Sequence, residues 1–194
     1  AEARRRNGPA TRRHTIAHVN LVQPDDLPRF RALGVIANMA PLWSRADPWE
    51  SIFAPRLFCP DRVHRLFPTR TLLAAGAIVV AGSDWPVTGV SPLEGLETAV
   101  THRYAGGRDP DGAEDHAFNP EERVSLEQAI VAYTSAGAYL VNEESERGSV
   151  EVGKQADLVV LARNVFDTPA LELHAVPVDL TIAAGRIVYA RSIP

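Results

Sequence analysis

The sequence predicts an α/β protein, with a parallel sheet connected by helices in its first part and a small antiparallel β unit at its end. Two observations predict the parallel sheet: apolar runs without polar alternation suit strands buried on both faces, and these runs alternate with segments of helical periodicity. A third observation predicts the antiparallel unit, because Gly185 separates two β-rich runs in the manner of a hairpin turn.

Local signals mark the elements of the first part. Asn7 and Gly8 end the last turn of a helix with which the sequence opens, and Gly34 ends the next helix, because these residues adopt the left-handed conformation that closes helices. The expected elements are the end of a helix at 1–8, a strand at 15–21, a helix from about 27 to 34, a strand at 35–40, an irregular stretch rich in proline and tryptophan at 41–62, a helix at 62–75 and a strand at 77–84.

The second part begins with helices and ends with strands. Ser125 and Gln128 have the spacing of a capping box, which marks a helix start. The expected elements are a helix at 92–104, a polar loop at 106–120, a helix at 125–141, a pair of turns at 148–157 and strands at 158–161, 178–183 and 186–189. Because the character of the chain changes near Gly148, we predict two domains, residues 1–147 and 148–194.

Composition excludes several classes of function. The formal net charge of −4 leaves no basic footprint for nucleic acid or an anionic membrane, and no apolar run is long enough to span a bilayer. The N-terminal residues do not resemble a signal peptide, and a single cysteine, Cys59, excludes an intramolecular disulfide and a cysteine-based zinc site. We therefore expect a cytoplasmic protein that binds neither nucleic acid nor membrane.

Asp84 is the first candidate for chemistry. It follows the apolar run of AIVVAGSDWPV (77–87), at the C-terminal end of the predicted strand, where parallel sheets and barrels place their functional groups. A carboxylate at this place is suited to bind a metal ion or to accept a proton. The alternative is that Asp84 caps the following loop by hydrogen bonds to its own backbone.

His18 is the second candidate, because it lies in a predicted buried strand near its C-terminal end. A buried imidazole needs partners for both ring nitrogens, and a metal ion is one such partner. The alternative is a core histidine that is hydrogen-bonded to backbone. His14 lies at the entry of the same strand, where a role in stability is expected; the other four histidines are expected at the surface: His64, His102, His116 and His174.

Four motifs together resemble the amidohydrolase superfamily. They are RRHTIAHV (12–19), GVIANMAP (34–41), LLAAGAIVVAGSDWPV (72–87) and GSVEVGKQADLVVL (148–161). The match is to the amidohydrolase-3 branch, which includes YtcJ-like proteins and N-substituted formamide deformylases. The resemblance implies the C-terminal part of a (β/α)8 TIM barrel, with strands six, seven and eight at 14–21, 35–40 and 77–84, followed by strands of a small β-sandwich.

The resemblance also implies roles for residues. His18 matches the metal ligand of strand six, and Asp84 matches the strand-eight aspartate that binds metal and accepts the proton of the attacking water. The implied cofactor is one or two divalent ions, expected to be zinc. The implied reaction is hydrolysis of a non-peptide carbon–nitrogen bond in a small amide, N-acyl or N-formyl substrate. Trp43 and Trp85 are expected to line the substrate pocket, with plain loop packing as the alternative.

The sequence also departs from the family pattern. The His-x-His pair of strand one, the strand-four ligand and the strand-five histidine are absent, and Ala17 stands where the branch often has glutamate before the strand-six histidine. We therefore expect a C-terminal fragment of a longer enzyme, whose site is completed by an N-terminal barrel half or by a homo-oligomer. Two alternatives stay open: an inactive module for assembly or interaction, and a deaminase or cyclic-amide hydrolase that uses the same site.

Overall fold

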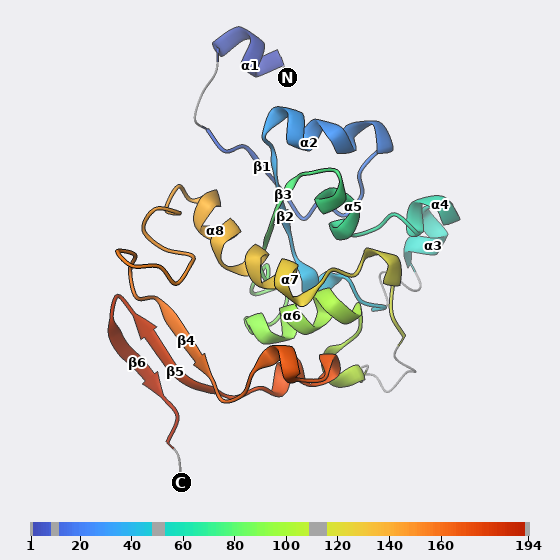
Figure 1. Ribbon diagram of the computed structural model, residues 1–194. Coiled ribbons are helices and arrows are strands. Elements are labelled where there is room, and N and C mark those ends of the chain that lie inside the picture. Colours follow the sequence, from blue (N-terminus) through green and yellow to red (C-terminus); the bar gives the residue numbers. More distant parts are fainter. Residues whose placement is uncertain (1, 9–11, 48–52, 109–115, 193–194) are drawn as a thin grey trace.

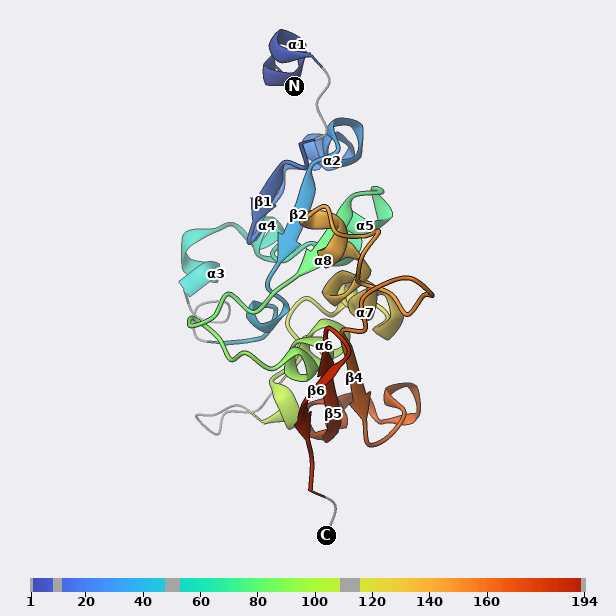
Figure 2. The same ribbon diagram turned by 90° about the vertical axis from the view of Figure 1, so that its left-hand side faces the viewer.

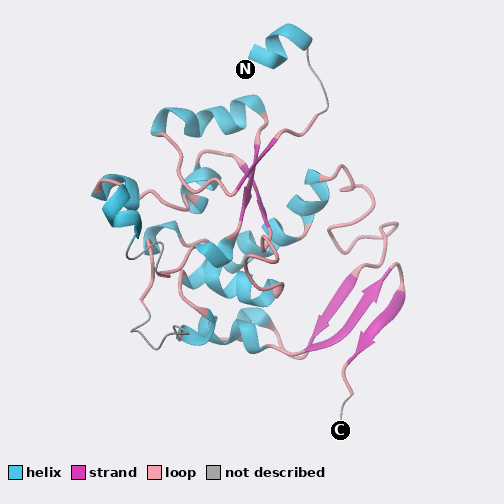
Figure 3. Cartoon of the chain, turned by 180° about the vertical axis from the view of Figure 1, so that it is seen from behind, coloured by secondary structure: helices cyan, strands magenta, loops and turns pink. Residues whose placement is uncertain are grey.

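The computed structural model describes residues 2–8, 12–47, 53–108 and 116–192 of the chain. Its strands form two separate three-stranded sheets, with helices packed around the first (Figures 1 and 3). The predicted α/β class is therefore confirmed. The assignment of the parallel strands to places six to eight of a barrel, and the domain boundary at 147/148, stay predictions.

The elements follow the predicted order. The helices are α1 (Glu2–Asn7), α2 (Leu27–Leu33), α3 (Ala54–Leu57), α4 (Pro60–Val63), α5 (Thr69–Ala74), α6 (Pro92–Thr101), α7 (Leu126–Tyr133) and α8 (Ser135–Leu140). The strands are β1 (Thr15–Ala17), β2 (Ile36–Met39), β3 (Ile78–Ala81), β4 (Leu158–Leu161), β5 (Val178–Ala183) and β6 (Arg186–Ala190). The 3-10 helices that matter below are η2 (Pro41–Trp43), η4 (Ala105–Gly107) and η7 (Ala170–Ala175).

The first sheet is parallel, in the order β1-β2-β3. Ala17 pairs with Asn38, and Asn38 pairs with Val80, so the three strands end at the same edge of the sheet. β2 and β3 are largely buried, as their apolar runs predict. The expectation of a buried first strand is wrong, because β1 is exposed along its length and is an edge strand within the described residues.

Helices α2 and α5 cover one face of this sheet. Phe30 of α2 and Leu72 of α5 pack with Ala37, Met39 and Val79 of the sheet in one hydrophobic cluster. The strand residues of this cluster alternate along β2, as a pleated strand requires. Gly34 closes α2 in the left-handed conformation that its sequence signal predicts, with φ of 59°.

The helix expected at 62–75 is divided into α4 and α5. Pro68 has no N–H to continue a helix and restricts the residue before it, and Phe67 has a φ of 54°. The stretch expected to be irregular contains η2 and α3, while 48–52 and 109–115 lie outside the described residues.

The helix expected at 125–141 also consists of two helices, α7 and α8. They meet at Thr134, whose ψ is −93° and whose hydroxyl donates to the carbonyl of Ile130 at 2.7 Å. The helix begins where the sequence predicts, because Ser125 and Gln128 form the predicted capping box.

Both α7 and α8 contact β3, and α6 lies beyond the C-terminal ends of the parallel strands, near η2 (Figures 1 and 2).

The second sheet is antiparallel, in the order β4-β5-β6. The predicted hairpin is confirmed: Ala184 and Gly185 connect β5 to β6, and both have a positive φ, as a tight two-residue hairpin turn requires. Several apolar side chains of this sheet are exposed, among them Val159, Ile187 and Val188.

The segment between β4 and β5 packs onto the first part of the chain. Leu173 of η7 lies in a cluster with Val165 and Val176, and residues of α6 and α7, including Val100 and Ile130, pack against it. The C-terminal sheet is therefore tied to the parallel sheet through α6 and η7, as Figure 1 shows.

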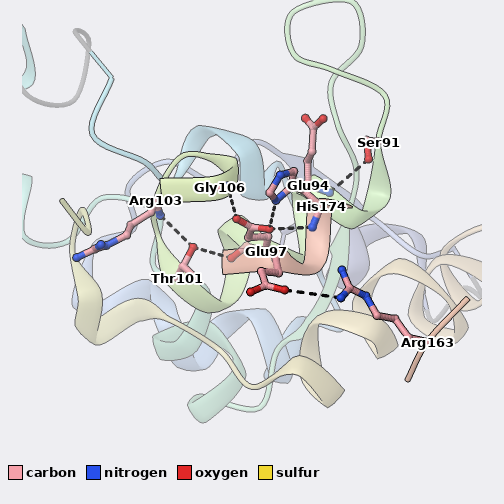
Figure 4. Close-up of polar contacts among 9 residues, drawn as sticks. Ser91, Glu94, Glu97, Thr101, Arg103, Gly106, Arg163 and His174 are labelled. Carbon is pink, nitrogen blue, oxygen red and sulfur yellow. Dashed lines mark hydrogen bonds and ion pairs between the residues drawn. The ribbon is translucent and has the colours of Figure 1, made fainter. Parts of the chain in front are cut away.

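A buried carboxylate strengthens this connection. Glu97 of α6 is 0% exposed, and its carboxylate accepts hydrogen bonds from Nδ1 of His174 at 2.7 Å, from the His174 backbone N–H at 2.8 Å and from the Gly106 N–H at 2.6 Å (Figure 4). Three donors compensate the desolvation of one carboxylate, which would otherwise be costly to bury. This pair joins α6, η4 and η7.

His102 contradicts the expectation of a surface histidine. It is 1% exposed, and its Nδ1 donates to the carbonyl of Phe118 at 2.6 Å. Burial lowers the pKa of His102 to about 4, since desolvation penalises the charged imidazolium. His174 also differs from the expectation because it pairs with Glu97, whereas His64 and His116 are exposed as predicted.

No helix within the described residues is long and apolar enough to cross a lipid bilayer.

Replacing Glu97 should destabilise the fold strongly. Glu97→Gln puts an amide N–H₂ among three N–H donors, and disrupting a buried, paired carboxylate costs about 3–5 kcal/mol. Urea unfolding measures the loss. Glu94→Gln, one turn earlier on α6 and partly exposed, is the matched control and should change the free energy of unfolding by less than about 0.5 kcal/mol. Equal unfolding midpoints for Glu97→Gln and the wild type would contradict this account.

The low pKa of His102 predicts a pH dependence of stability. The folded histidine titrates near 4 and the unfolded one near 6.5, so the unfolded chain binds more protons between these values. Stability should therefore fall as the pH drops from 6.5 to 4, by about 3 kcal/mol from this group.

The matched variant is His102→Asn, since asparagine tolerates the left-handed backbone of this position and retains an N–H donor. Urea unfolding as a function of pH should show a shallower slope for His102→Asn than for the wild type. His64→Asn, at an exposed position, should retain the wild-type slope. The same slope in all three proteins would show that His102 is not the titrating group.

Candidate functional site

The structure brings His18 and Asp84 together at the C-terminal edge of the parallel sheet. His18 directly follows β1, and Asp84 follows β3 after a short Gly82-Ser83 link. Nδ1 of His18 lies 3.8 Å from Oδ2 of Asp84, and the two side chains are 45% and 32% exposed. His18 is thus more exposed than expected, because it directly follows the edge strand β1. His14 precedes β1 at the opposite end of the strand, as predicted.

Backbone hydrogen bonds fix both residues relative to β2. The N–H of His18 donates to the carbonyl of Asn38 at 2.8 Å, and the N–H of Gly82 donates to the carbonyl of Met39 at 3.0 Å. Beyond these bonds, His18 and Asp84 adopt left-handed conformations with φ of 69° and 57°. Aspartate and histidine occupy this region more readily than most residues, which allows the chain to turn there.

The alternative role for Asp84, a cap of its own loop, finds no support among the described residues. The hydroxyl of Ser83, and not the carboxylate of Asp84, accepts the hydrogen bond from the N–H of Trp85 at 3.3 Å. The backbone carbonyl of Asp84 closes a turn with the N–H of Val87 at 2.9 Å. Within the described part of the chain, the carboxylate of Asp84 contacts His18 as its polar partner.

The two predicted pocket residues differ in their positions. The indole ring of Trp43, in η2, lies 5.4 Å from the imidazole of His18 between ring centroids, and it also packs against a cluster with Phe67 and Phe118. Trp85 is 68% exposed and has no such packing in that cluster. The structure therefore brings Trp43 to the His18–Asp84 pair and leaves the Trp85 side chain in solvent.

The His18–Asp84 pair fits a shared metal ion in its donor types and separation. Imidazole nitrogen and carboxylate oxygen are both zinc ligands, and two ligands at about 2.0–2.1 Å from one ion can lie at most about 4.2 Å apart. The observed 3.8 Å is within that limit. Within the described residues, no group of three or more His, Cys, Asp or Glu side chains could hold a metal ion.

Sequence reasoning did not single out Arg45 in the segment after Trp43. Arg45 lies there with its guanidinium carbon 4.4 Å above the ring of Tyr104, which is itself buried. No sequence pattern marks this contact, because Tyr104 lies directly before η4, far along the chain. The Glu97–His174 pair was also missed, and its role is to connect α6 to η7.

Comparison with known proteins identifies relatives that match up to 95% of the chain. The sequence profile of the amidohydrolase family matches residues 1–189. Protein LONG AFTER FAR-RED 3 of Arabidopsis thaliana is 32% identical over 183 residues, which is 94% of this chain and 30% of that protein. The putative amidohydrolase YtcJ of Bacillus subtilis is 28% identical over 186 residues, 95% of this chain and 34% of that protein.

An N-substituted formamide deformylase of Arthrobacter pascens is 35% identical over 128 residues, 66% of this chain and 22% of that protein. The chain thus spans about a third or less of the length of these relatives. Among solved structures, an uncharacterized metal-dependent hydrolase from Pyrococcus furiosus matches with a TM-score of 0.62 and 25% identity, over 77% of this chain and 28% of that one. From the family profile and these relatives, this chain belongs to the amidohydrolase family, as its four motifs predict.

Proposed function

We propose that this chain carries part of the active site of a metal-dependent hydrolase that cleaves non-peptide carbon–nitrogen bonds, in an amide, N-acyl or N-formyl substrate. The observation that carries the proposal is the 3.8 Å approach of His18 Nδ1 to Asp84 Oδ2 at the C-terminal edge of parallel strands. Membership of the amidohydrolase family supports it, as does the resemblance to a protein named as an N-substituted formamide deformylase.

In this proposal His18 and Asp84 hold one divalent ion, for which zinc is the best candidate given nitrogen and oxygen ligands. When bound, such an ion lowers the pKa of a water molecule towards neutrality and polarises a carbonyl group. Asp84 accepts the proton of the attacking water and delivers it to the leaving amine nitrogen, a task that suits a carboxylate with few competing hydrogen bonds. Trp43 lies beside the His18 ring and forms one wall of the site.

The proposal includes a requirement for further ligands. A catalytic zinc site uses three protein ligands, so at least one ligand is needed in addition to His18 and Asp84. We propose that residues beyond these 194, in the same polypeptide or in a partner chain, supply them along the exposed side of β1. In this account the chain alone is inactive.

A second candidate function is a non-catalytic module for interaction or assembly. Two observations favour it: the described residues contain no complete metal cluster, and the Arabidopsis relative has a name that states no chemical activity. The two candidates differ in whether hydrolysis appears once a complete ligand set is present.

The decisive variant is Asp84→Asn, in a protein that carries this chain together with a complete metal-ligand set. Loss of the proton acceptor should lower kcat for an N-substituted formamide by about 10²–10⁴-fold, while the fold is retained. His18→Ala should lower the zinc content measured by elemental analysis, since it removes a neutral nitrogen ligand.

Asp26→Asn is a suitable control, because Asp26 is partly exposed and pairs with Arg29 away from the site. It should leave both kcat and zinc content unchanged. Undiminished hydrolysis by Asp84→Asn, with a zinc content equal to that of the wild type, would contradict the proposal. Absence of hydrolysis and of bound metal in the wild-type protein would favour the non-catalytic module.

A further inference from the structure

A series of contacts leads from η7, in the C-terminal part of the chain, towards the candidate site. It begins at Glu97 of α6, whose buried carboxylate accepts from Nδ1 of His174 at 2.7 Å and from the N–H of Gly106 at 2.6 Å (Figure 4). The N–H of Gly107 in turn donates to the carbonyl of Tyr104 at 2.9 Å. The Glu97–His174 pair therefore fixes η4 and, through η4, the backbone of Tyr104.

Tyr104 continues this series towards the parallel sheet. Its side chain is buried, and the guanidinium carbon of Arg45 lies 4.4 Å from the centroid of its ring. The face of an aromatic ring attracts a cation, and the attraction is stronger where water is excluded. Because Tyr104 is buried and its backbone is held by η4, this contact restrains the position of Arg45.

Arg45 is connected to Trp43 by a short segment with hydrogen bonds of its own. The N–H of Trp43 donates to the carbonyl of Ala40 at 3.0 Å. The N–H of Ser44 donates to the carbonyl of Pro41 at 2.8 Å, and the Ser44 side chain is buried. Since planar peptides leave only two soft dihedral angles per residue, a displacement of Arg45 is transmitted to Trp43 over two peptide units.

Trp43 ends the series at the candidate site. Its indole ring lies 5.4 Å from the imidazole of His18 between ring centroids, and Nδ1 of His18 lies 3.8 Å from Oδ2 of Asp84. His18 directly follows the exposed edge strand β1, and its side chain is 45% exposed. Its ring therefore has little packing of its own, and the contact with Trp43 restricts its orientation.

We propose that Arg45 and Tyr104 are positioning residues of the candidate site, because their contact holds the Trp43 ring against His18. The buried carboxylate of α6 holds that contact in place, so the C-terminal part of the chain controls the geometry of the site. Coupling between separate parts of a fold is carried by packed side chains and hydrogen bonds of this kind. For its effect on catalysis this inference rests on the proposed function, but the geometry that it predicts requires neither metal nor hydrolysis.

NMR spectra of this chain, recorded without added metal, test the step through Trp43. The indole ring shifts the C–H signals of the His18 imidazole, and Trp43→Leu gives their position without the indole. Arg45→Met removes the cation and retains an apolar stem over the ring of Tyr104. It should move the His18 signals most of the way to their position in Trp43→Leu. In the Trp43→Leu background Arg45→Met should move them no further, because it acts through the indole.

Tyr104 provides a matched pair of variants. Tyr104→Phe retains the ring and should leave the His18 signals unchanged, whereas Tyr104→Leu should displace them as Arg45→Met does. Combining Arg45→Met with Tyr104→Leu should displace them no more than either change alone, as expected for two residues in one contact. Arg29→Met removes an exposed arginine that pairs with Asp26, and should have no effect.

Unchanged His18 signals in Arg45→Met would overturn the inference. A displacement of equal size by Arg45→Met in the Trp43→Leu background would also overturn it, because Arg45 would then act by another route. If Arg45→Met does not fold, Arg45→Gln replaces it in both comparisons, with the same expected results.

His174→Ala tests the distant end of the series. It removes the ring that donates to Glu97 and should displace the His18 signals in the same direction as Arg45→Met. His174→Asn retains an N–H donor and should restore them. If His174→Ala does not fold, His174→Leu, which retains more of the side-chain volume, replaces it. Unchanged His18 signals in a folded variant without the donor would overturn the control by the C-terminal part of the chain.

Hydrolysis separates this inference from the proposed function. In a protein with a complete ligand set, Arg45→Met should lower kcat for an N-substituted formamide by about tenfold to a hundredfold, since small misplacements at a site are costly. Its zinc content should equal that of the wild type. No hydrolysis by the wild type, with displaced His18 signals in Arg45→Met, would remove the proposed function and leave the inference. Hydrolysis that requires Asp84, with His18 signals insensitive to Arg45→Met, would do the reverse.

Discussion

The parallel register of β1, β2 and β3 is the constraint on which the candidate site depends. β2 lies between the other two strands, so the backbones of β1 and β3 are about 9.6 Å apart, at two strand spacings. The side chains of His18 and Asp84 nevertheless approach to 3.8 Å, because both residues leave their strands in the left-handed conformation. A slip of one residue in either pairing would turn the side chains to the opposite face. The pairing of Ala17 with Asn38 is therefore as important to the site as the side chains themselves.

The parts of the fold that the sequence predicts well are those with local causes. The apolar runs at 35–40 and 77–84 became β2 and β3, the capping box at Ser125 starts α7, and Gly185 lies in a two-residue hairpin. Each of these signals acts within a few residues, so it is visible in a linear sequence. His18 and Asp84 were also identified from their places at strand ends together with the resemblance to a family, and the structure brings them together.

What the sequence does not predict depends on contacts between distant segments. The exposure of β1 follows from its edge position in the sheet, which no local pattern reveals. His102 is buried with its ring hydrogen-bonded to the carbonyl of Phe118, 16 residues along the chain, and Arg45 is identified only through its contact with Tyr104. In each case the burial or contact of the residue depends on a segment that is distant in the sequence, whereas secondary-structure propensities act over only a few residues.

The Glu97–His174 pair has a consequence for the order in which the chain assembles. Its members are 77 residues apart, so their contact closes a long loop, and such contacts form after local ones because their entropy cost must first be met. Before η7 packs against α6, the carboxylate of Glu97 is in contact with water. A segment that lies 77 residues further along the chain therefore completes the desolvation of α6. Interactions of this kind, absent from early stages of folding, chiefly slow unfolding and so prolong the lifetime of the native state.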